Sequence, residues 1–196
     1  MLDLQIQALL RSNEVKQIAF TMRGIRVTGW GFQELSNRFS DRSIPRRIRV
    51  TVRPELVSPT AEAEYVPDTD KILLRSANVL DTVTGRASVV HECTHAQLDM
   101  RGVSTPLRSE EAAAFIAEAW YLLACRVSTA IIDNHVSAEI RQIAQSLRER
   151  SNRVIGAPVE MTSDEINTAR RVMGRFGYGS GHYTSDGIRG YRYSGD

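Results

Sequence analysis

Two histidines four residues apart, in the stretch VVHECTHAQLD at residues 89–99, constrain this chain more than any other feature. The surrounding pattern predicts a helix from about residue 84 to residue 101, because Gly102 is a typical helix stop. On a helix, residues i and i+4 lie on one face, one turn apart. His91 and His95 can therefore direct their ring nitrogens at a single point.

Imidazoles at this spacing suit a metal ion, which lies about 2.0–2.1 Å from each nitrogen when the metal is zinc. Glu92 lies beside the first histidine, where its carboxylate can hold a metal-bound water without binding the metal itself. We therefore interpret His91 and His95 as metal ligands and Glu92 as a catalytic general base. The alternative interpretation is an ordinary amphipathic helix that carries two histidines.

The same stretch resembles the active-site helix of the zincin metallopeptidases. It is similar to the thermolysin-like branch in having an aspartate, Asp99, four residues beyond the second histidine. The resemblance is strong over about fifteen residues and implies a catalytic Zn²⁺ and hydrolysis of amide bonds. A Glu-Ala-Ala-Ala-aromatic segment after this helix is also similar to small uncharacterised bacterial zincin-like proteins.

A catalytic zinc takes three protein ligands and leaves one position open for water. The extended metzincin pattern is absent, since Leu98 and Arg101 stand at its glycine and histidine positions. In gluzincins the third ligand is a glutamate on the next helix. The candidates here are Glu110, Glu111 and Glu118.

Helix geometry leaves two of these glutamates open as the third ligand. The predicted helix rises about 9 Å from His95 to its end, and an antiparallel return helix must climb by a similar amount. A return helix that begins at Thr105 reaches Glu111 at that height, whereas one that begins at Ser109 approaches Glu118. The resemblance to zincins, through a glutamate directly before Ala-Ala-Ala-Phe, favours Glu111.

The groups that support the ligands are less constrained by the sequence. Phe115 stands four residues after Glu111, where thermolysin-like enzymes have an aspartate that holds a histidine ligand. Asp99, Asp133 or a backbone carbonyl is expected to hold it instead. A second electrophile for the oxyanion is expected from His182 or Tyr183 in the Gly/Tyr-rich tail, with a surface tail as the alternative.

The rest of the chain predicts an α+β fold of the zincin type, with a small antiparallel or mixed sheet and a helical C-terminal half. We expect one domain over residues 1–196, with an irregular tail at 178–196. Residues 70–77 are interpreted either as an edge strand for substrate pairing or as a core hairpin strand. The other predicted elements are helices within residues 2–18, 31–39, 104–132, 138–150 and 164–176, a strand at 46–54, and a hairpin of 63–66 with 71–75.

Composition narrows the partners and the compartment. The net charge of +2, from 25 basic and 23 acidic residues, argues against a dedicated nucleic-acid-binding protein. No apolar run is long enough for a membrane span and no secretory signal begins the chain, so we expect a cytoplasmic protein, with export by a dedicated secretion route left open. Cys93 and Cys125 are expected to be reduced thiols.

These features predict a zinc metallopeptidase with a peptide or protein substrate and an undetermined oligomeric state. The first alternative is a non-catalytic helical binding module with a structural or vestigial metal site. Glu92 argues against it, because a structural site does not need that carboxylate. The second alternative, a nucleic-acid-binding domain that uses the arginines and the tail, is disfavoured by the balanced charge.

Overall fold

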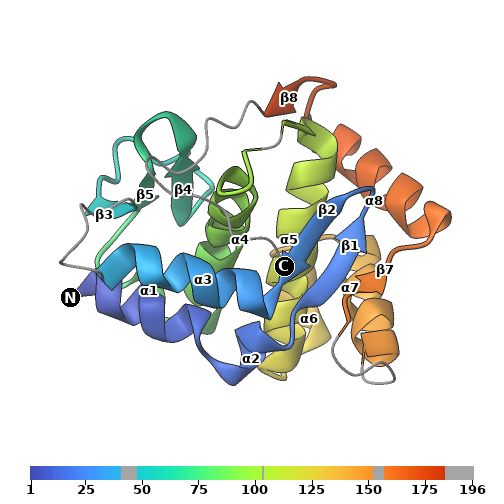
Figure 1. Ribbon diagram of the computed structural model, residues 1–196, viewed down its shortest axis with the longest axis horizontal. Helices are drawn as coiled ribbons and strands as arrows, with labels where there is room; N and C mark the ends of the chain where they lie inside the picture. Colours follow the sequence, from blue (N-terminus) through green and yellow to red (C-terminus); the bar gives the residue numbers. More distant parts are fainter. Residues whose placement is uncertain (41–47, 103, 152–156, 184–196) are drawn as a thin grey trace.

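The computed structural model describes residues 1–40, 48–102, 104–151 and 157–183, which form an α+β structure (Figure 1). Its helices are α1 (Leu2–Leu10), α2 (Asn13–Lys16), α3 (Gly29–Ser40), α4 (Val83–Asp99), α5 (Leu107–Ala124), α6 (Thr129–Asp133), α7 (Ala138–Ser151) and α8 (Ser163–Arg175), with short 3₁₀ turns η1 (Pro67–Thr69) and η2 (Val79–Asp81). Its strands are β1 (Ala19–Met22), β2 (Ile25–Thr28), β3 (Arg49–Val52), β4 (Ala63–Val66), β5 (Lys71–Leu74), β6 (Thr105–Pro106), β7 (Val159–Glu160) and β8 (His182–Tyr183).

The N-terminal region contains a hairpin that the helical pattern did not predict. Helix α2 ends at Lys16, and β1 and β2 pair antiparallel across a turn in which Arg23 and Gly24 both have positive φ. Gly29, directly after β2, lies close to the backbone of Lys16. A Cβ at this position would be only 2.3 Å from the carbonyl oxygen of Lys16, so only glycine fits. Helix α3, predicted over residues 31–39, is confirmed and packs on α1 (Figure 1).

The predicted strand and hairpin form a mixed three-stranded sheet in the order β3-β5-β4. Strand β5 is the central strand, parallel to β3 and antiparallel to β4, so the interpretation of residues 70–77 as an edge strand is wrong. The reason is visible in burial: Ile72, Leu73 and Leu74 are all buried, as in a strand covered on both faces. Strand β4 alternates buried and half-buried residues and lies at the edge that faces α4.

Helix α4 lies in the middle of the molecule, between the β3-β5-β4 sheet and α5 (Figure 1). It begins where the Thr82 hydroxyl accepts a hydrogen bond from the backbone N–H of Gly85, and it ends at Asp99, close to the predicted end. Gln97 ties its last turns to the end of β2 through hydrogen bonds to the backbone of Thr28. The histidine-bearing helix is therefore a core helix held on several sides.

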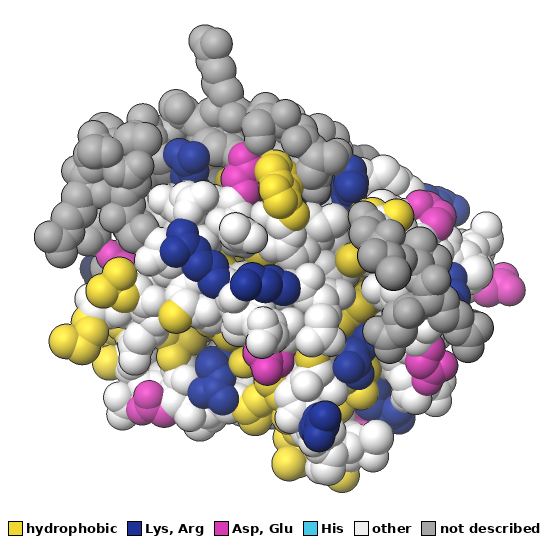
Figure 2. Space-filling model, turned by 60° about the horizontal axis from the view of Figure 1, so that its bottom comes forward, with side chains coloured by type: hydrophobic (Ala, Val, Ile, Leu, Met, Phe, Trp, Pro, Cys, Tyr) yellow, Lys and Arg dark blue, Asp and Glu magenta, His cyan; other side chains and the backbone are white. Residues whose placement is uncertain are grey.

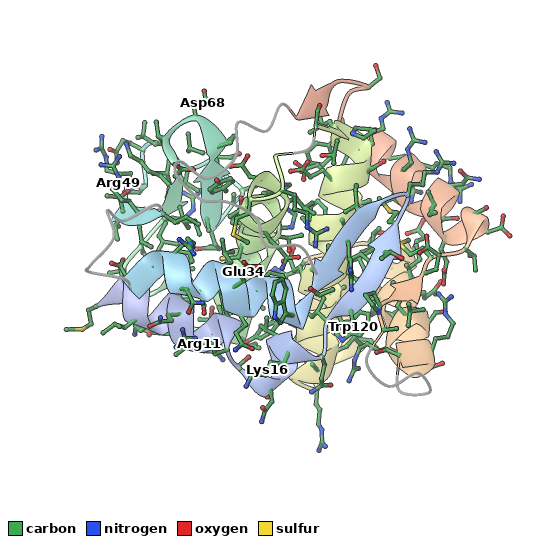
Figure 3. All side chains as sticks on the ribbon, in the orientation of Figure 1. Arg11, Lys16, Glu34, Arg49, Asp68 and Trp120 are labelled. Atoms are coloured by element: carbon green, nitrogen blue, oxygen red, sulfur yellow. The ribbon has the colours of Figure 1, made fainter. Side chains whose placement is uncertain are left out.

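Helix α5 returns antiparallel to α4 and supplies the second wall of the site. It begins after Pro106, which agrees with the earlier of the two predicted starts. The predicted single helix through residue 132 is wrong, because α5 ends at Ala124 and Arg126 adopts a positive φ of 58° before α6 begins. Trp120 of α5 is buried and stacks on Phe20 of β1, which joins the helix to the N-terminal hairpin (Figure 3).

The C-terminal helices follow the predicted boundaries closely. Ser137 accepts a hydrogen bond from the N–H of Ile140 at the start of α7, as expected for a cap. At α8 the cap is Thr162, which forms a reciprocal capping box with Glu165. Strand β8 then pairs with β6, which brings the chain after α8 back to the start of α5.

The surface agrees with the balanced composition. On the face over α1, α2 and α3, lysine and arginine side chains are scattered among neutral and apolar atoms, and no histidine is visible (Figure 2). In the part of the chain that the structure describes, no helix is both long and apolar enough to cross a membrane.

Candidate metal centre

Helices α4 and α5 bring together three side chains that could hold a metal ion. The Nε2 atom of His91 lies 3.6 Å from one carboxylate oxygen of Glu111, and Nε2 of His95 lies 3.8 Å from the other. Ligand atoms of the three residues lie within 4.8 Å of one another. A tetrahedral zinc ion places its ligand atoms about 3.3 Å apart. Small movements that shorten the distances between the Nε2 atoms and the Glu111 oxygens would therefore bring the three side chains to the spacing of zinc ligands.

The two other candidate glutamates contact the histidine rings at Nδ1, on the side away from Glu111. Glu118 lies 3.1 Å from Nδ1 of His91, and Glu110 lies 3.0 Å from Nδ1 of His95. A carboxylate on one ring nitrogen fixes the tautomer and turns the other nitrogen toward a metal. Glu111 thus lies opposite the Nε2 atoms of the two histidines. Glu110 and Glu118 hold the Nδ1 atoms, a role that the sequence analysis gave to Asp99, Asp133 or a backbone carbonyl.

The residues expected to orient the histidines have other partners. Asp99 accepts a hydrogen bond of 2.7 Å from the hydroxyl of Tyr65, and Asp133 forms an ion pair with Arg141. The expectation failed because α5 carries more than one glutamate toward α4, which motif spacing on α4 alone could not reveal. Thr105 additionally donates a hydrogen bond to Glu110 from the strand that precedes α5.

The electrostatics of the centre call for a cation. Glu110, Glu111 and Glu118 are each 5% exposed, and buried carboxylates are costly unless a positive charge or hydrogen bonds compensate them. Burial pushes the pKa of His91 down, but hydrogen bonds to Glu111 and Glu118 outweigh this and raise it well above its ordinary value. For His95, burial is likewise outweighed, chiefly by the hydrogen bond to Glu110. The raised pKa values favour positively charged imidazoles among these carboxylates, and a divalent ion would supply that positive charge in their place.

Glu92 lies beside the triad without belonging to it. Its carboxylate accepts a 2.7 Å hydrogen bond from the backbone N–H of Tyr65 in the edge strand β4. Burial raises the pKa of Glu92, while the two histidines and this N–H partly oppose the shift. A buried carboxylate with a raised pKa next to a metal site has the properties of a general base.

The triad and Glu92 open into one cavity of about 590 Å³. Strand β4 and the segment before it form one wall, and α5 with the residues that follow α8 forms the other. The lining residues are Ser58, Thr60, Ala61, Glu62, Ala63, Glu64, Tyr65, Ser88, His91, Glu92, His95, Glu111, Phe115, Glu118, His135 and Tyr178.

Tyr178 is a site residue that the sequence analysis missed. Its hydroxyl is hydrogen-bonded to Glu111, and burial, followed by the charge of Glu111, raises its pKa. The Nε of Arg108 in α5 donates to the Tyr178 carbonyl at 2.8 Å and so fixes the segment. The expected His182 and Tyr183 have side chains outside the described residues. No spacing rule distinguished Tyr178 from the other tyrosines of the tail.

Apolar groups complete the wall beside the histidines. The ring of Phe115 meets His91 edge-on, with ring centroids 4.5 Å apart, and contacts Phe176 and Tyr178 on its other side. Phe115 thus holds the imidazole of His91 by packing on its ring. Cys93 is fully buried, and burial raises the pKa of its thiol well above the ordinary value, which agrees with a structural thiol.

Comparison of the chain with models of known protein families, with curated protein sequences and with solved structures found no match. The candidate metal site of His91, His95 and Glu111 therefore rests on the geometry of the α4–α5 pair.

Proposed function

We propose that this protein is a zinc-dependent hydrolase, a metallopeptidase of the gluzincin type that cleaves amide bonds. The observation that carries the proposal is the convergence of His91, His95 and Glu111, with a carboxylate behind each histidine and Glu92 alongside. Two imidazoles and one carboxylate form a donor set typical of catalytic zinc, which leaves a coordination position open.

Zinc bound there would polarise a substrate carbonyl and lower the pKa of its water to about 7. The protein's own residues supply the proton transfers and the orientation. Glu92 accepts a proton from the attacking water and passes it to the leaving amine. Glu110 and Glu118 keep the two imidazoles in the tautomer that presents Nε2.

Tyr178 is placed to stabilise the oxyanion that forms during attack. Its hydroxyl lines the cavity and contacts Glu111, and its raised pKa keeps it protonated as a hydrogen-bond donor. It takes the role that the sequence assigned to His182 or Tyr183.

Strand β4 offers the backbone on which an extended substrate can lie. In the described residues it is hydrogen-bonded to β5 on one side, and its Tyr65 N–H points the other way, to Glu92. A peptide added to this edge would pass beside the triad. The edge that supports substrate pairing is thus Ala63–Val66 rather than residues 70–77.

A non-catalytic module with a structural metal site is the alternative. Structural zinc sites are closed by four protein ligands. The group found among the described residues contains three, and it faces a cavity rather than a packed interior. Both features favour the catalytic interpretation.

The decisive test is zinc per chain, measured by plasma mass spectrometry on protein reconstituted with zinc and then desalted. We expect about one zinc in the parent and none in Glu111→Ala. Asp68→Asn, a charge change at the tip of the β4–β5 hairpin away from the cavity, is the control and should keep its zinc (Figure 3). Hydrolysis of a mixed peptide pool by the parent and not by Glu92→Gln completes the test. A reconstituted parent without zinc would exclude the proposal.

A further inference from the structure

Two carboxylates line the cavity without serving the metal centre. Glu62 directly precedes β4 and Glu64 lies within it, so their side chains project from the same face of the strand. Glu64 accepts a 3.2 Å hydrogen bond from the N–H of Ser58. Glu62 is exposed, and its carboxylate makes no hydrogen bond or ion pair to any described residue. Its charge is therefore directed at the solvent in the cavity.

The cavity is acidic even with a divalent ion in place. Glu92, Glu110, Glu111 and Glu118 together carry two more negative charges than such an ion neutralises. Glu62 and Glu64 add to this excess. Although the chain has 25 lysines and arginines, none of them is among the described residues that line the cavity.

The guanidinium of Arg75 is hydrogen-bonded to the backbone beside the cavity. Arg75 donates from Nε to the carbonyl of Ala61 at 2.6 Å and also donates to the carbonyl of Ser58. These bonds hold the segment before β4 in place. Arg75 is not among the residues that line the cavity, and its single positive charge offsets only one of the negative charges of the wall.

Strand geometry relates these carboxylates to a bound chain. The N–H of Tyr65 lies on the open edge of β4 and donates to Glu92, so a peptide on this edge would pair with the N–H and carbonyl of Ala63 and with the carbonyl of Tyr65. Every second side chain of that peptide would then lie on the face of Glu62 and Glu64. Directly opposite side chains on paired strands have Cβ atoms about 4.5–5.5 Å apart.

We propose that Glu62 and Glu64 make this cleft selective for polypeptides that carry lysine or arginine close to the bond that is cut. The inference rests on the proposed peptidase function for its cleavage step. It rests on the edge strand and the acidic wall alone for the recognition of basic side chains.

A cleavage experiment tests the selectivity. The zinc-loaded parent, the Glu62→Gln/Glu64→Gln double variant and the Asp68→Asn control are each incubated with a mixed peptide library, and cut sites are mapped by mass spectrometry. Glutamine keeps the acceptor for the Ser58 N–H and removes only the charge. We expect lysine and arginine to be enriched within three residues of the cut in the parent and the control. The enrichment should fall about tenfold in the double variant.

A binding experiment separates this inference from the proposed function. Zinc-loaded Glu92→Gln protein is titrated into fluorescein-labelled peptides of alternating Ala-Lys or Ala-Glu, with anisotropy as the readout. We expect the Ala-Lys peptide to bind more tightly than the Ala-Glu peptide. Adding Glu62→Gln/Glu64→Gln should weaken Ala-Lys binding about tenfold, whereas adding Asp68→Asn should not.

The outcomes are distinguishable. Selective binding of Ala-Lys without cleavage by the parent would exclude the peptidase and leave the cation-selective cleft standing. Cleavage without preference for basic residues, together with equal affinity for the two peptides, would overturn the inference and leave the peptidase standing. A preference that persists unchanged in the double variant would also overturn the assignment to Glu62 and Glu64.

Discussion

The paired helices α4 and α5 carry two polar clusters, which differ in how their charged groups are compensated. Near the start of α4, Arg86 contacts the hydroxyl of Tyr121 on α5 and the carbonyls of Leu80 and Asp81. Cys125 adds a thiol that is hydrogen-bonded to Tyr121. This cluster lines a shallow depression of about 460 Å³ on the surface.

The two clusters differ in the balance of positive and negative charge. At the first one, a single cation is satisfied by carbonyl and hydroxyl oxygens, so nothing further is required. At the second, the carboxylates of Glu92, Glu110, Glu111 and Glu118 surround two imidazoles, and a cation is needed to compensate them. The same helix pair thus builds one cation held by uncharged oxygen atoms and one carboxylate-rich centre whose geometry suits a metal ion. Variants at the two clusters should therefore differ in activity, in zinc binding and in stability.

The largest difference between variants at the two clusters is expected in the rate of peptide hydrolysis. Glu92→Gln should lower kcat of peptide hydrolysis by about 10²–10⁴-fold, because general-base catalysis contributes that much. Zinc content should stay at the parent level, since Glu92 is not among the three converging ligands. Tyr121→Phe, at the other cluster of the helix pair, should change neither quantity. Equal activity in Glu92→Gln and the parent would remove Glu92 from the mechanism.

The stability of the metal-free protein and the stabilising effect of zinc should change with pH in opposite directions. His91 and His95 have raised pKa values in the folded, metal-free protein, so the folded state binds more protons than the unfolded state above pH 6.5. The free energy of unfolding of metal-free protein should therefore fall as pH rises from about 6 to about 9. Zinc binding requires neutral imidazoles, so its stabilising effect should grow over the same range.

Thermal unfolding of EDTA-treated and zinc-saturated protein across this range checks the prediction. Zinc in about hundredfold excess over its Kd should contribute about 2.7 kcal/mol. A Tm of the metal-free protein that rises with pH would contradict the assigned direction of the histidine pKa shifts.

The orienting carboxylates should have an intermediate effect on zinc affinity. Glu118→Gln and Glu110→Gln should each weaken zinc binding about 10–100-fold, as is typical for groups that hold a histidine ligand. Competition with a chromogenic chelator gives the Kd. Glu139→Gln removes a carboxylate of α7 that pairs with Arg175 and should leave the Kd unchanged. If Glu118→Gln lost all zinc and Glu111→Ala kept it, Glu118 would be the metal ligand and Glu111 would not.

The sequence predicted the parts of this site that follow from local periodicity. The i, i+4 spacing placed His91 and His95 on one face, and the strand pattern gave β4 and β5 nearly to the residue. The resemblance to zincins singled out Glu111, which the structure brings opposite the Nε2 atoms.

The contacts that the sequence missed depend on how distant segments pack. The support of the histidines by Glu110 and Glu118 depends on the rotation of α5 against α4, which no local pattern fixes. Tyr178 reaches Glu111 because β8 pairs with β6 and returns the chain to the start of α5. The central position of β5 likewise depends on its parallel pairing with β3, twenty-odd residues earlier in the chain.

The smallest predicted contrast concerns two buried tyrosine hydroxyls. Tyr65 donates to the carboxylate of Asp99, whereas Tyr121, whose pKa burial raises to about 12, meets Arg86 at 3.2 Å. Hydrogen bonds to charged groups contribute about 1.5–3 kcal/mol, but Arg86 also donates to two backbone carbonyls and depends less on its longer contact with Tyr121. Tyr65→Phe should therefore lower the free energy of unfolding more than Tyr121→Phe, because Arg86 keeps its carbonyl acceptors.

Urea unfolding of both variants at constant zinc measures this difference. Tyr65→Phe should also raise KM for peptides more than it lowers kcat, because the Tyr65–Asp99 bond ties the edge strand β4 to α4 and so places the strand beside Glu92. Tyr121→Phe should leave KM unchanged. If the two variants were equally stable and kinetically alike, the hydrogen bond to Asp99 would have no special role in holding the substrate edge against the metal centre.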